Sequence, residues 1–191
     1  MDEVRAAVAA GKGAIFATSH SGNWELMGGA FACAGLPIVG VAKRQSSAGM
    51  DRFINEYRRS VGMHITYKDN VREMFALLKR GWAIGLLMDQ DISRRDGIVF
   101  QWFGRPTNFV QGPAVLARHQ NAPIIPGFIH RLPDGRHRIF LHPPIFVDRT
   151  KDKEEDIRKA MEVVARTLEQ HIRRYPEEWF WLHDRWKSQR D

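Results

Sequence analysis

A histidine and a glutamate five residues apart, His20 and Glu25, are the residues whose types and spacing best suit catalysis. On one continuous helix, two residues five apart point about 140° away from each other. A bend between them is therefore required if they are to act together. Residues 21–23 (Ser-Gly-Asn) are of the types that form turns and cap helices.

The local sequence predicts how this pair is held. The apolar run 13–18 predicts a strand that leads into His20, and residues 24–27 predict the first turn of a helix. Ligands bind outside the carboxyl ends of strands in open α/β sheets, and the helix dipole favours a carboxylate in a first turn. We expect Glu25 to stay ionised and to orient His20, whose imidazole could act as a general base. Such spacing also occurs by chance, with either residue serving as an ordinary surface or capping group.

The rest of the chain predicts an α/β domain with a mostly parallel or mixed central sheet flanked by helices. Short apolar or β-branched runs predict strands over residues 13–18, 38–42, 64–67, 83–88 and 122–129. Helical patterns lie between and after them, over residues 24–34, 48–61, 70–80, 112–119 and about 154–174. Strands that alternate with helices favour parallel pairing.

Composition and charge limit the class of protein. The 191 residues, 43% of them hydrophobic, suit one domain with a single sizeable core. The net charge of +7 indicates an anionic partner, such as a phosphorylated substrate, a phospholipid surface or nucleic acid, although a well-solvated surface explains it equally. The longest uncharged stretch, 26–42, is rich in glycine and shorter than a membrane span. Residues 1–5 do not resemble a signal peptide, so we expect a cytosolic domain.

Several familiar chemistries have no motif here. The sequence lacks a Gly-x-Ser-x-Gly elbow, a P-loop and a His-Glu-x-x-His motif, and its histidines show no metal-ligand spacing. We therefore expect no metal site and no cofactor, and no nucleic-acid fold signature is present. Cys33 lies among small residues and is expected to be buried in the core.

Five segments together resemble one family, the bacterial lipid A biosynthesis acyltransferases of the lysophospholipid acyltransferase superfamily. The segments are residues 19–27, 86–91, 103–106, 111–114 and 179–187, in the order in which the family has them. The resemblance covers nearly the whole chain and implies a glycerolipid acyltransferase-like fold. It also implies O-acyl transfer from a thioester of acyl carrier protein or coenzyme A to a hydroxyl of an anionic glycolipid, such as a lipid A precursor. The thioester is then a co-substrate, and no cofactor is implied.

The resemblance assigns roles to particular residues. His20 and Glu25 match the family's catalytic pair, so His20 would remove the hydroxyl proton while Glu25 holds the imidazole. Arg44 is the candidate donor to the oxyanion by its position in the family pattern; it could instead grip an acceptor phosphate or be a solvated loop cation. Asp89 and Asp91 follow a predicted strand and would share the sheet edge of His20, where they could bind acceptor hydroxyls, anchor Arg44 or simply form a turn.

Aromatic segments leave two alternatives open. Phe103 and Gly104 are candidate substrate-binding residues on resemblance alone. The neighbouring aromatics Phe100, Trp102 and Phe109 could line an acyl channel, but an aromatic cluster more often packs in a core. Likewise, the aromatic and basic residues of 179–187 could face a membrane interface, but core packing is the expected role.

Family members usually begin with a membrane-anchoring hydrophobic segment, whereas this chain starts close to the catalytic strand. We therefore expect residues 1–191 to be one catalytic domain without that anchor, peripheral to the cytoplasmic face of the bacterial inner membrane. A nearby alternative changes the acceptor to a phosphoinositide mannoside or a lysophospholipid. A different-class alternative is a noncatalytic basic lipid-binding module, whose binding would survive the loss of His20.

Overall fold

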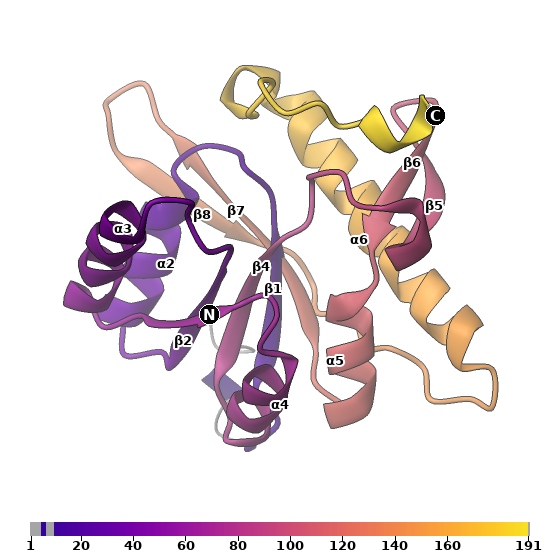
Figure 1. Cartoon of the computed structure of the whole chain (residues 1–191), viewed down its shortest axis with the longest axis horizontal. Coiled ribbons are helices and arrows are strands. Elements are labelled where there is room, and N and C mark those ends of the chain that lie inside the picture. The colour runs from indigo at the N-terminus through magenta and orange to yellow at the C-terminus, as the bar shows by residue number, and fades with distance from the viewer. Residues whose placement is uncertain (1–4, 7–9, 191) are drawn as a thin grey trace.

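The described residues, 5–6 and 10–190 of a computed structural model, form a six-stranded sheet in the order β3-β2-β4-β1-β7-β8 (Figure 1). The first five strands in this order run parallel, and the edge strand β8 runs antiparallel to β7. Their bounds are β1 Ala14–Thr18, β2 Ile38–Ala42, β3 His64–Tyr67, β4 Ala83–Leu87, β7 Ile124–Arg131 and β8 His137–Leu141. Residues 1–4, in the segment compared with a signal peptide, lie outside the described residues.

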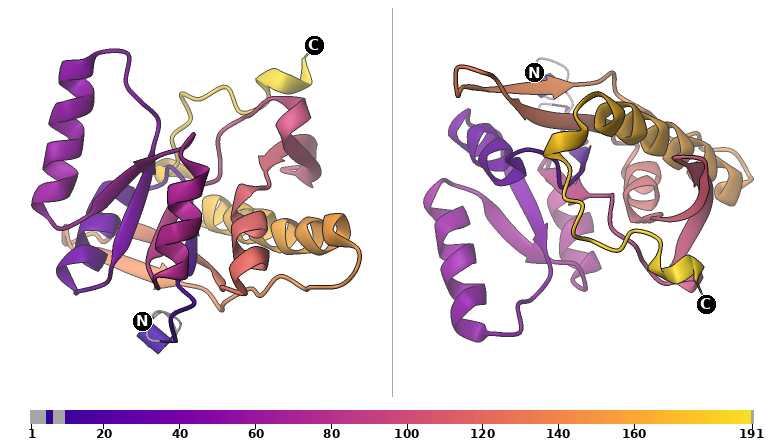
Figure 2. Two further views of the ribbon diagram at one scale, coloured as in Figure 1. Left: turned by 60° about the horizontal axis from the view of Figure 1, so that its bottom comes forward. Right: turned by 90° about the horizontal axis from the view of Figure 1, so that it is seen from above.

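Helices cover both faces of this sheet. A separate two-stranded hairpin lies in the link between β4 and the helix that follows it in the chain. The main helices are α2 Trp24–Cys33, α3 Ala48–Ser60, α4 Val71–Lys79, α5 Gly112–Gln120 and α6 Lys153–Arg174. The hairpin consists of β5 Gly97–Trp102 and β6 Arg105–Val110. Three short 3-10 turns lie at Arg94–Asp96, Pro176–Glu178 and Lys187–Gln189. The view from above in Figure 2 shows the segment after α6 crossing over the sheet toward the hairpin.

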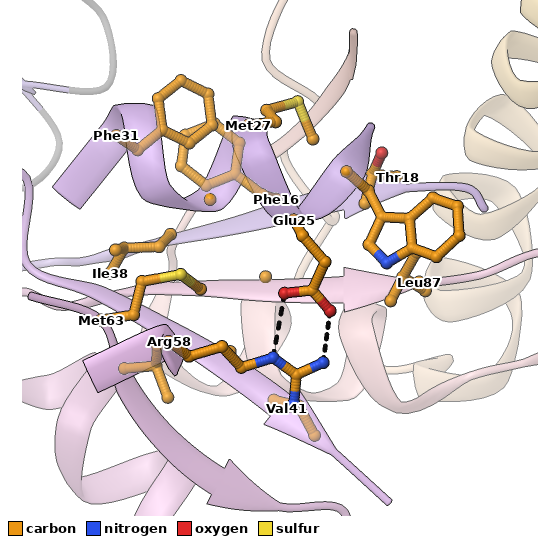
Figure 3. A pocket seen from close by; sticks show the side chains of 15 residues that line it. Phe16, Thr18, Glu25, Met27, Phe31, Ile38, Val41, Arg58, Met63 and Leu87 are labelled. Atoms are coloured by element: carbon orange, nitrogen blue, oxygen red, sulfur yellow. Dashed lines mark hydrogen bonds and ion pairs between the residues drawn. The ribbon is translucent and has the colours of Figure 1, made fainter. Parts of the chain in front are cut away.

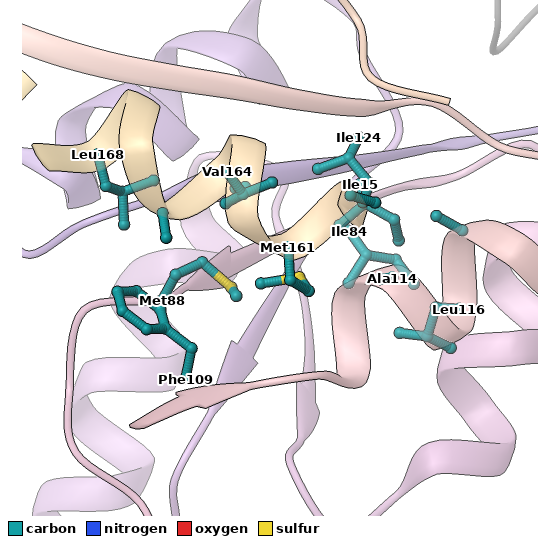
Figure 4. Close-up of a cluster of buried hydrophobic side chains, with 14 of the residues drawn as sticks. Ile15, Ile84, Met88, Phe109, Ala114, Leu116, Ile124, Met161, Val164 and Leu168 are labelled. Atoms are coloured by element: carbon teal, nitrogen blue, oxygen red, sulfur yellow. The ribbon is translucent and has the colours of Figure 1, made fainter. Parts of the chain in front are cut away.

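Alternation along the strands divides the core between the two faces. On β1, Ile15 and Ala17 pack with α4, α5, α6 and the hairpin, whereas Ala14 and Phe16 pack with α2. Figure 4 shows α6 directing Met161, Val164 and Leu168 toward the hairpin and the ends of β1 and β4. The apolar stripe of α6 therefore holds the hairpin against the sheet.

The predicted elements agree closely with the structure, because their caps are local. Asn23 caps α2 by accepting a hydrogen bond from the Leu26 N–H, and Asp152 does the same for α6 with Glu155. The predicted fold class, a mostly parallel sheet flanked by helices, is confirmed. The β5–β6 hairpin and the edge strand β8 were not among the predicted strands. The prediction for Cys33 was wrong, because it is the last residue of α2 and its side chain is exposed.

Within the described residues, no helix is both long enough and apolar enough to span a bilayer.

The aromatic cluster predicted to be core is confirmed as core for Phe100, Trp102 and Phe109, all of which are buried. Trp102 contacts the rings of Phe109 and Trp179 edge-on. The aromatic side chains of the hairpin therefore pack against the C-terminal segment.

A buried histidine on α6 makes the fold sensitive to acid. His171 stacks on Phe128 with ring centroids 3.9 Å apart. Burial, aided by the charges of His142, His130 and Arg174, lowers the pKa of His171 to about 4. An unfolded histidine titrates near 6.5.

We expect stability to fall as the pH drops from about 6.5 to about 4, because the unfolded chain binds a proton there that folded His171 does not. Above that window the contribution of His171 is complete. His171→Gln should flatten the pH dependence of the melting temperature over this window. His137→Gln, at an exposed position, should leave it unchanged; equal pH slopes for wild type and His171→Gln would refute the assignment.

Candidate functional site

The site lies at the carboxyl ends of the neighbouring strands β1 and β4. After these two strands the chain continues toward opposite edges of the sheet. The link after β1 leads to β2 on one side of the sheet, and the link after β4 leads to β7 on the other. Such a switch point opens a crevice at the carboxyl ends of the two strands. Thr18 is paired with Leu87 in the parallel register, so the residues two places further on, His20 and Asp89, come side by side.

His20 and Asp89 are joined by hydrogen bonds from both side chain and backbone. The His20 Nδ1 lies 2.9 Å from Asp89 Oδ1, and the His20 backbone N–H donates to both carboxylate oxygens at 3.0 Å. The indole N–H of Trp179 donates to Oδ2 at 2.8 Å. Asp89 is buried, which opposes ionisation, but the hydrogen bond and charge of His20, with the bond from Trp179, outweigh this and lower the pKa of Asp89.

The C-terminal segment holds the histidine from the other side. The Phe180 N–H donates to the His20 carbonyl at 2.9 Å, and the Gly22 N–H donates to the Glu178 carbonyl at 3.0 Å. Gly22 has a φ of +59°, and a Cβ there would lie 2.4 Å from the Ile129 carbonyl oxygen. Only glycine fits this turn without displacing the backbone.

The imidazole of His20 has a defined orientation. Trp24 meets it edge-on with centroids 4.9 Å apart, and the ring of Phe180 lies 6.4 Å away. With Nδ1–H assigned as the donor to Asp89, Nε2 is the nitrogen left to accept a proton from a ligand. His20 also lines a large groove, so this nitrogen can serve a molecule bound there.

Glu25 takes a partner other than the one expected. Arg58 Nε donates to Glu25 Oε2 at 2.9 Å, and Arg58 Nη2 donates to Oε1, forming a two-pronged ion pair between α2 and α3 (Figure 3). Asp89 therefore occupies the place on His20 that the sequence assigned to Glu25. The reason is geometric, because β4 delivers Asp89 beside His20 in register, while α2 directs Glu25 toward α3. A catalytic role for Glu25 stays a prediction.

The groove beside His20 is large and is lined by apolar side chains together with four cations and two carboxylates, those of Glu25 and Glu154. Its volume is about 800 Å³. Its cationic lining residues are Lys43, Arg58, Lys68 and Lys153. Its apolar lining includes Trp24, Val71, Met74, Phe75, Leu86 and Leu116. A ligand with an anionic part and a long apolar part suits such a lining.

A narrow apolar cavity lies behind the Glu25–Arg58 pair. Its volume is about 80 Å³, and it runs between α2 and the sheet past Phe16, Phe31 and Met63 (Figure 3). Trp24, Glu25, Val41, Arg58 and Leu87 line both this cavity and the groove. The ion pair thus stands at the boundary between the two spaces.

The other predicted residues are dispersed. The Arg44 guanidinium lies over the Tyr67 ring, 3.7 Å from its centroid, in a polar hollow outside the groove. Neither Asp89 nor Asp91 anchors it, because both carboxylates are engaged elsewhere. Phe103 and Gly104 form the β5–β6 turn, with positive φ at both positions, away from the groove lining. Substrate contacts by Arg44, Phe103 and Gly104 stay predictions.

Asp91 binds the C-terminal segment. Its carboxylate accepts hydrogen bonds from the Ser188 N–H and hydroxyl and from Arg185 Nη1, at 2.6, 2.8 and 3.3 Å. Arg185 is fully buried between the rings of Trp102 and Phe109. Burial lowers the pKa of Arg185 to about 10, although the charges of Asp91 and Asp89 oppose this. A substrate contact by Asp91 stays a prediction that this geometry does not favour.

Sequence reasoning missed the residues that complete the site from a distance. Arg58 lies 33 positions from Glu25, and Trp179 lies 90 positions from Asp89. The only local signal was the aromatic and basic composition of the C-terminal segment, which also suits plain packing. In the part of the chain that the structure describes, no three His, Cys, Asp or Glu side chains gather as metal ligands.

Comparison with known proteins gives consistent relatives. The model of a family described as "Bacterial lipid A biosynthesis acyltransferase" matches residues 1–188. A phosphatidylinositol mannoside acyltransferase of Mycobacterium tuberculosis is 29% identical over 97% of this chain and 58% of its own length. The corresponding enzyme of Mycolicibacterium smegmatis is 27% identical over 97% of this chain and 60% of its own length. The lipid A biosynthesis palmitoleoyltransferase of Escherichia coli is 28% identical over 63% of this chain and 39% of its own length.

The chain thus spans a little over half the length of the mycobacterial relatives that it matches. Among solved structures, a 1-acyl-sn-glycerophosphate acyltransferase from Thermotoga maritima aligns with a TM-score of 0.47 and 17% identity. That alignment covers 84% of this chain and 66% of the other.

Asp91→Ala should lower the free energy of unfolding by about 3 kcal/mol, because it leaves the buried Arg185 unpaired. Asp148→Ala, at an exposed position, should change it by less than about 0.5 kcal/mol. Both are measured by urea unfolding. Unchanged stability in Asp91→Ala, combined with a raised KM, would instead assign Asp91 to ligand binding.

Proposed function

Because the chain belongs to the bacterial lipid A biosynthesis acyltransferase family, we propose that it carries the catalytic centre of a lipid O-acyltransferase. The reaction moves a fatty acyl chain from a thioester of acyl carrier protein or coenzyme A to a hydroxyl of a glycolipid, such as a lipid A precursor. The observation that supports this most directly is the His20–Asp89 pair at the edge of an amphipathic groove.

In the proposed mechanism, His20 acts as the general base. Its Nε2 takes the proton of the acceptor hydroxyl as that oxygen attacks the thioester carbonyl, and Asp89 stabilises the imidazolium that forms. The tetrahedral intermediate then expels the thiolate, which receives the proton from His20. The transfer is direct, so no acyl-enzyme is formed.

The developing oxyanion needs a donor, and the groove supplies cations for it. Lys43 lines the groove next to Arg44 in sequence, whereas Arg44 would have to leave the Tyr67 ring to reach it. We assign Lys43 to this role, with Arg44 as the alternative. Lys68, which also lines the groove, would then face the anionic part of the acceptor.

A phosphatidylinositol mannoside is the second candidate acceptor. The relatives named for that lipid align with 97% of this chain, whereas the relative named for lipid A aligns with 63%. Both acceptors pair a polar, anionic head with acyl chains, which suits the mixed polar and apolar lining of the groove. For either acceptor, we place the protein at the cytoplasmic face of the inner membrane.

Asp89→Asn should lower kcat by about 10² to 10⁴-fold, because it removes the charge that orients and stabilises protonated His20 while keeping its size. His20→Ala should abolish transfer. The measurement is transfer of labelled acyl chains to a panel of lipid A precursors, phosphatidylinositol mannosides and lysophospholipids. Asp134→Asn, at an exposed turn, is the matched control. Wild-type turnover by His20→Ala would overturn the mechanism, and the labelled lipid would identify the acceptor.

Glu25 and Arg58 should act as one unit. If their ion pair shapes the groove, the single variants Glu25→Gln and Arg58→Gln and the double variant should all lose a similar amount of activity. The coupling energy between the two changes is then about as large as the free-energy effect of either change alone. If Glu25 instead acts on His20, only Glu25→Gln should depress kcat. Glu56→Gln, an exposed glutamate on α3, serves as the control.

A further inference from the structure

After α6 the chain crosses back over the site. Residues 176–181 of this C-terminal segment, which we call the strap, lie along the turn that follows β1. Trp179 of the strap and Ser21 of that turn form an isolated antiparallel bridge. The strap residues on either side of Trp179 make backbone hydrogen bonds to the same turn, and the Trp179 indole reaches Asp89. The strap therefore contacts both members of the histidine–aspartate pair.

The side chain of Glu178 ties the strap to β7. Its Oε1 accepts a hydrogen bond from the Arg131 backbone N–H at 3.0 Å. The same oxygen lies 2.7 Å from His130 Nδ1, a close contact that forms no hydrogen bond. His130 and Arg131 are the last two residues of β7, which pairs with β1 in the sheet. One carboxylate oxygen thus connects the strap with the strand beside β1.

The same carboxylate packs against the turn that carries the histidine. Oε2 of Glu178 is buried, and a Cβ at Gly22 would lie 2.7 Å from it. This oxygen finds no hydrogen-bond partner among the described residues. A buried acceptor without a partner is unfavourable, so the other contacts of the carboxylate must hold it there. At the start of the strap, Tyr175 stacks on His130 with ring centroids 4.1 Å apart.

We propose that Glu178 is a positioning residue for the reaction at His20. Through the hydrogen bond from the Arg131 N–H, its carboxylate holds the strap on β7, and the strap in turn holds His20 and Asp89. The inference rests on the proposed function, because acyl transfer is the reaction that this pair would carry out. Among the residues that the structure describes, the groove lining does not include Glu178, so it acts through the strap.

A role for Glu178 in stability alone makes a different prediction. Loss of a positioning bond changes the geometry of the folded protein, whereas loss of a merely stabilising bond lowers the melting temperature and leaves the folded geometry as it was. The indole N–H of Trp179 reports on the geometry at Asp89. The indole N–H of Trp82 is the internal reference, because Trp82 precedes β4 and lies at the opposite end of that strand from Asp89.

The first measurement is a 1H–15N NMR spectrum of the full chain without substrate, so its result does not depend on turnover. Glu178→Ala should shift the indole resonance of Trp179. It should also weaken the Nδ1 proton signal of His20, because that proton exchanges with water faster once its bond to Asp89 loosens. The indole resonance of Trp82 should stay in place.

Three further variants separate the hydrogen bond from the charge and from the fold. Glu178→Gln keeps an acceptor oxygen for the Arg131 N–H and should give the wild-type spectrum. Glu178→Asp keeps the charge but draws the oxygen back toward the strap, so it should reproduce the changes of Glu178→Ala and replaces that variant if it does not fold. Glu177→Ala, at the exposed neighbouring glutamate, is the matched control.

The second measurement is transfer of labelled acyl chains to the lipid that the wild-type protein acylates. Glu178→Ala should lower kcat by about 10²-fold, because a displacement of about 1 Å at the reacting groups has an effect of that size. KM for the acceptor should not change, because the groove lining is intact. Glu178→Gln and Glu177→Ala should keep the wild-type kcat.

A wild-type spectrum for Glu178→Ala, whatever its melting temperature, would overturn the proposal. So would a wild-type kcat in that variant. A loss in Glu178→Gln as large as that in Glu178→Ala would also overturn it, since the bond from Arg131 would not be the interaction that acts. If the wild-type chain transfers no acyl group but the Trp179 and His20 signals respond as expected, Glu178 still positions the pair and the proposed function fails.

Discussion

The contact between His20 and Asp89 is the constraint on which the rest of the site depends. Three donors, the imidazole Nδ1–H, the His20 backbone N–H and the Trp179 indole, converge on one buried carboxylate. Each donor favours the ionised form, and together they outweigh the cost of burial. The carboxylate in turn fixes the ring, so that a single nitrogen remains for a ligand. The position of this pair follows from the register of β1 and β4 at the switch point of the sheet.

The C-terminal segment belongs to the site although it follows the last helix. Trp179 and Phe180 contact Asp89 and His20, and the segment beyond them is held by Asp91 through Arg185 and Ser188. Asp89 and Asp91 are two residues apart, so one short loop after β4 both orients the histidine and anchors the segment that covers it. Local opening of that segment would release His20 from one side.

Polar contacts also explain which side of α3 faces the rest of the protein. Asp51, Asn55 and Arg58 bind Tyr67 and Glu25, which commits the inward side of the helix to hydrogen bonds and an ion pair. The apolar residues are thereby left outside. The same ion pair lines both the large groove and the narrow apolar cavity behind it. The Glu25–Arg58 ion pair therefore contributes both to the lining of the groove and to the orientation of α3.

The sequence by itself determined the local elements, because caps, turns and periodic apolar residues act over a few positions. It predicted the five parallel strands and the main helices nearly to the residue, it favoured core packing for the aromatic cluster, and it placed His20 and Asp89 at one sheet edge. Only the tertiary structure decided which carboxylate meets His20, because spacing along the chain favoured Glu25 and strand register delivered Asp89. It likewise decided the roles of Arg58, Trp179 and Arg185. Their partners lie 33 to 94 positions away, where chain spacing carries no information about contact.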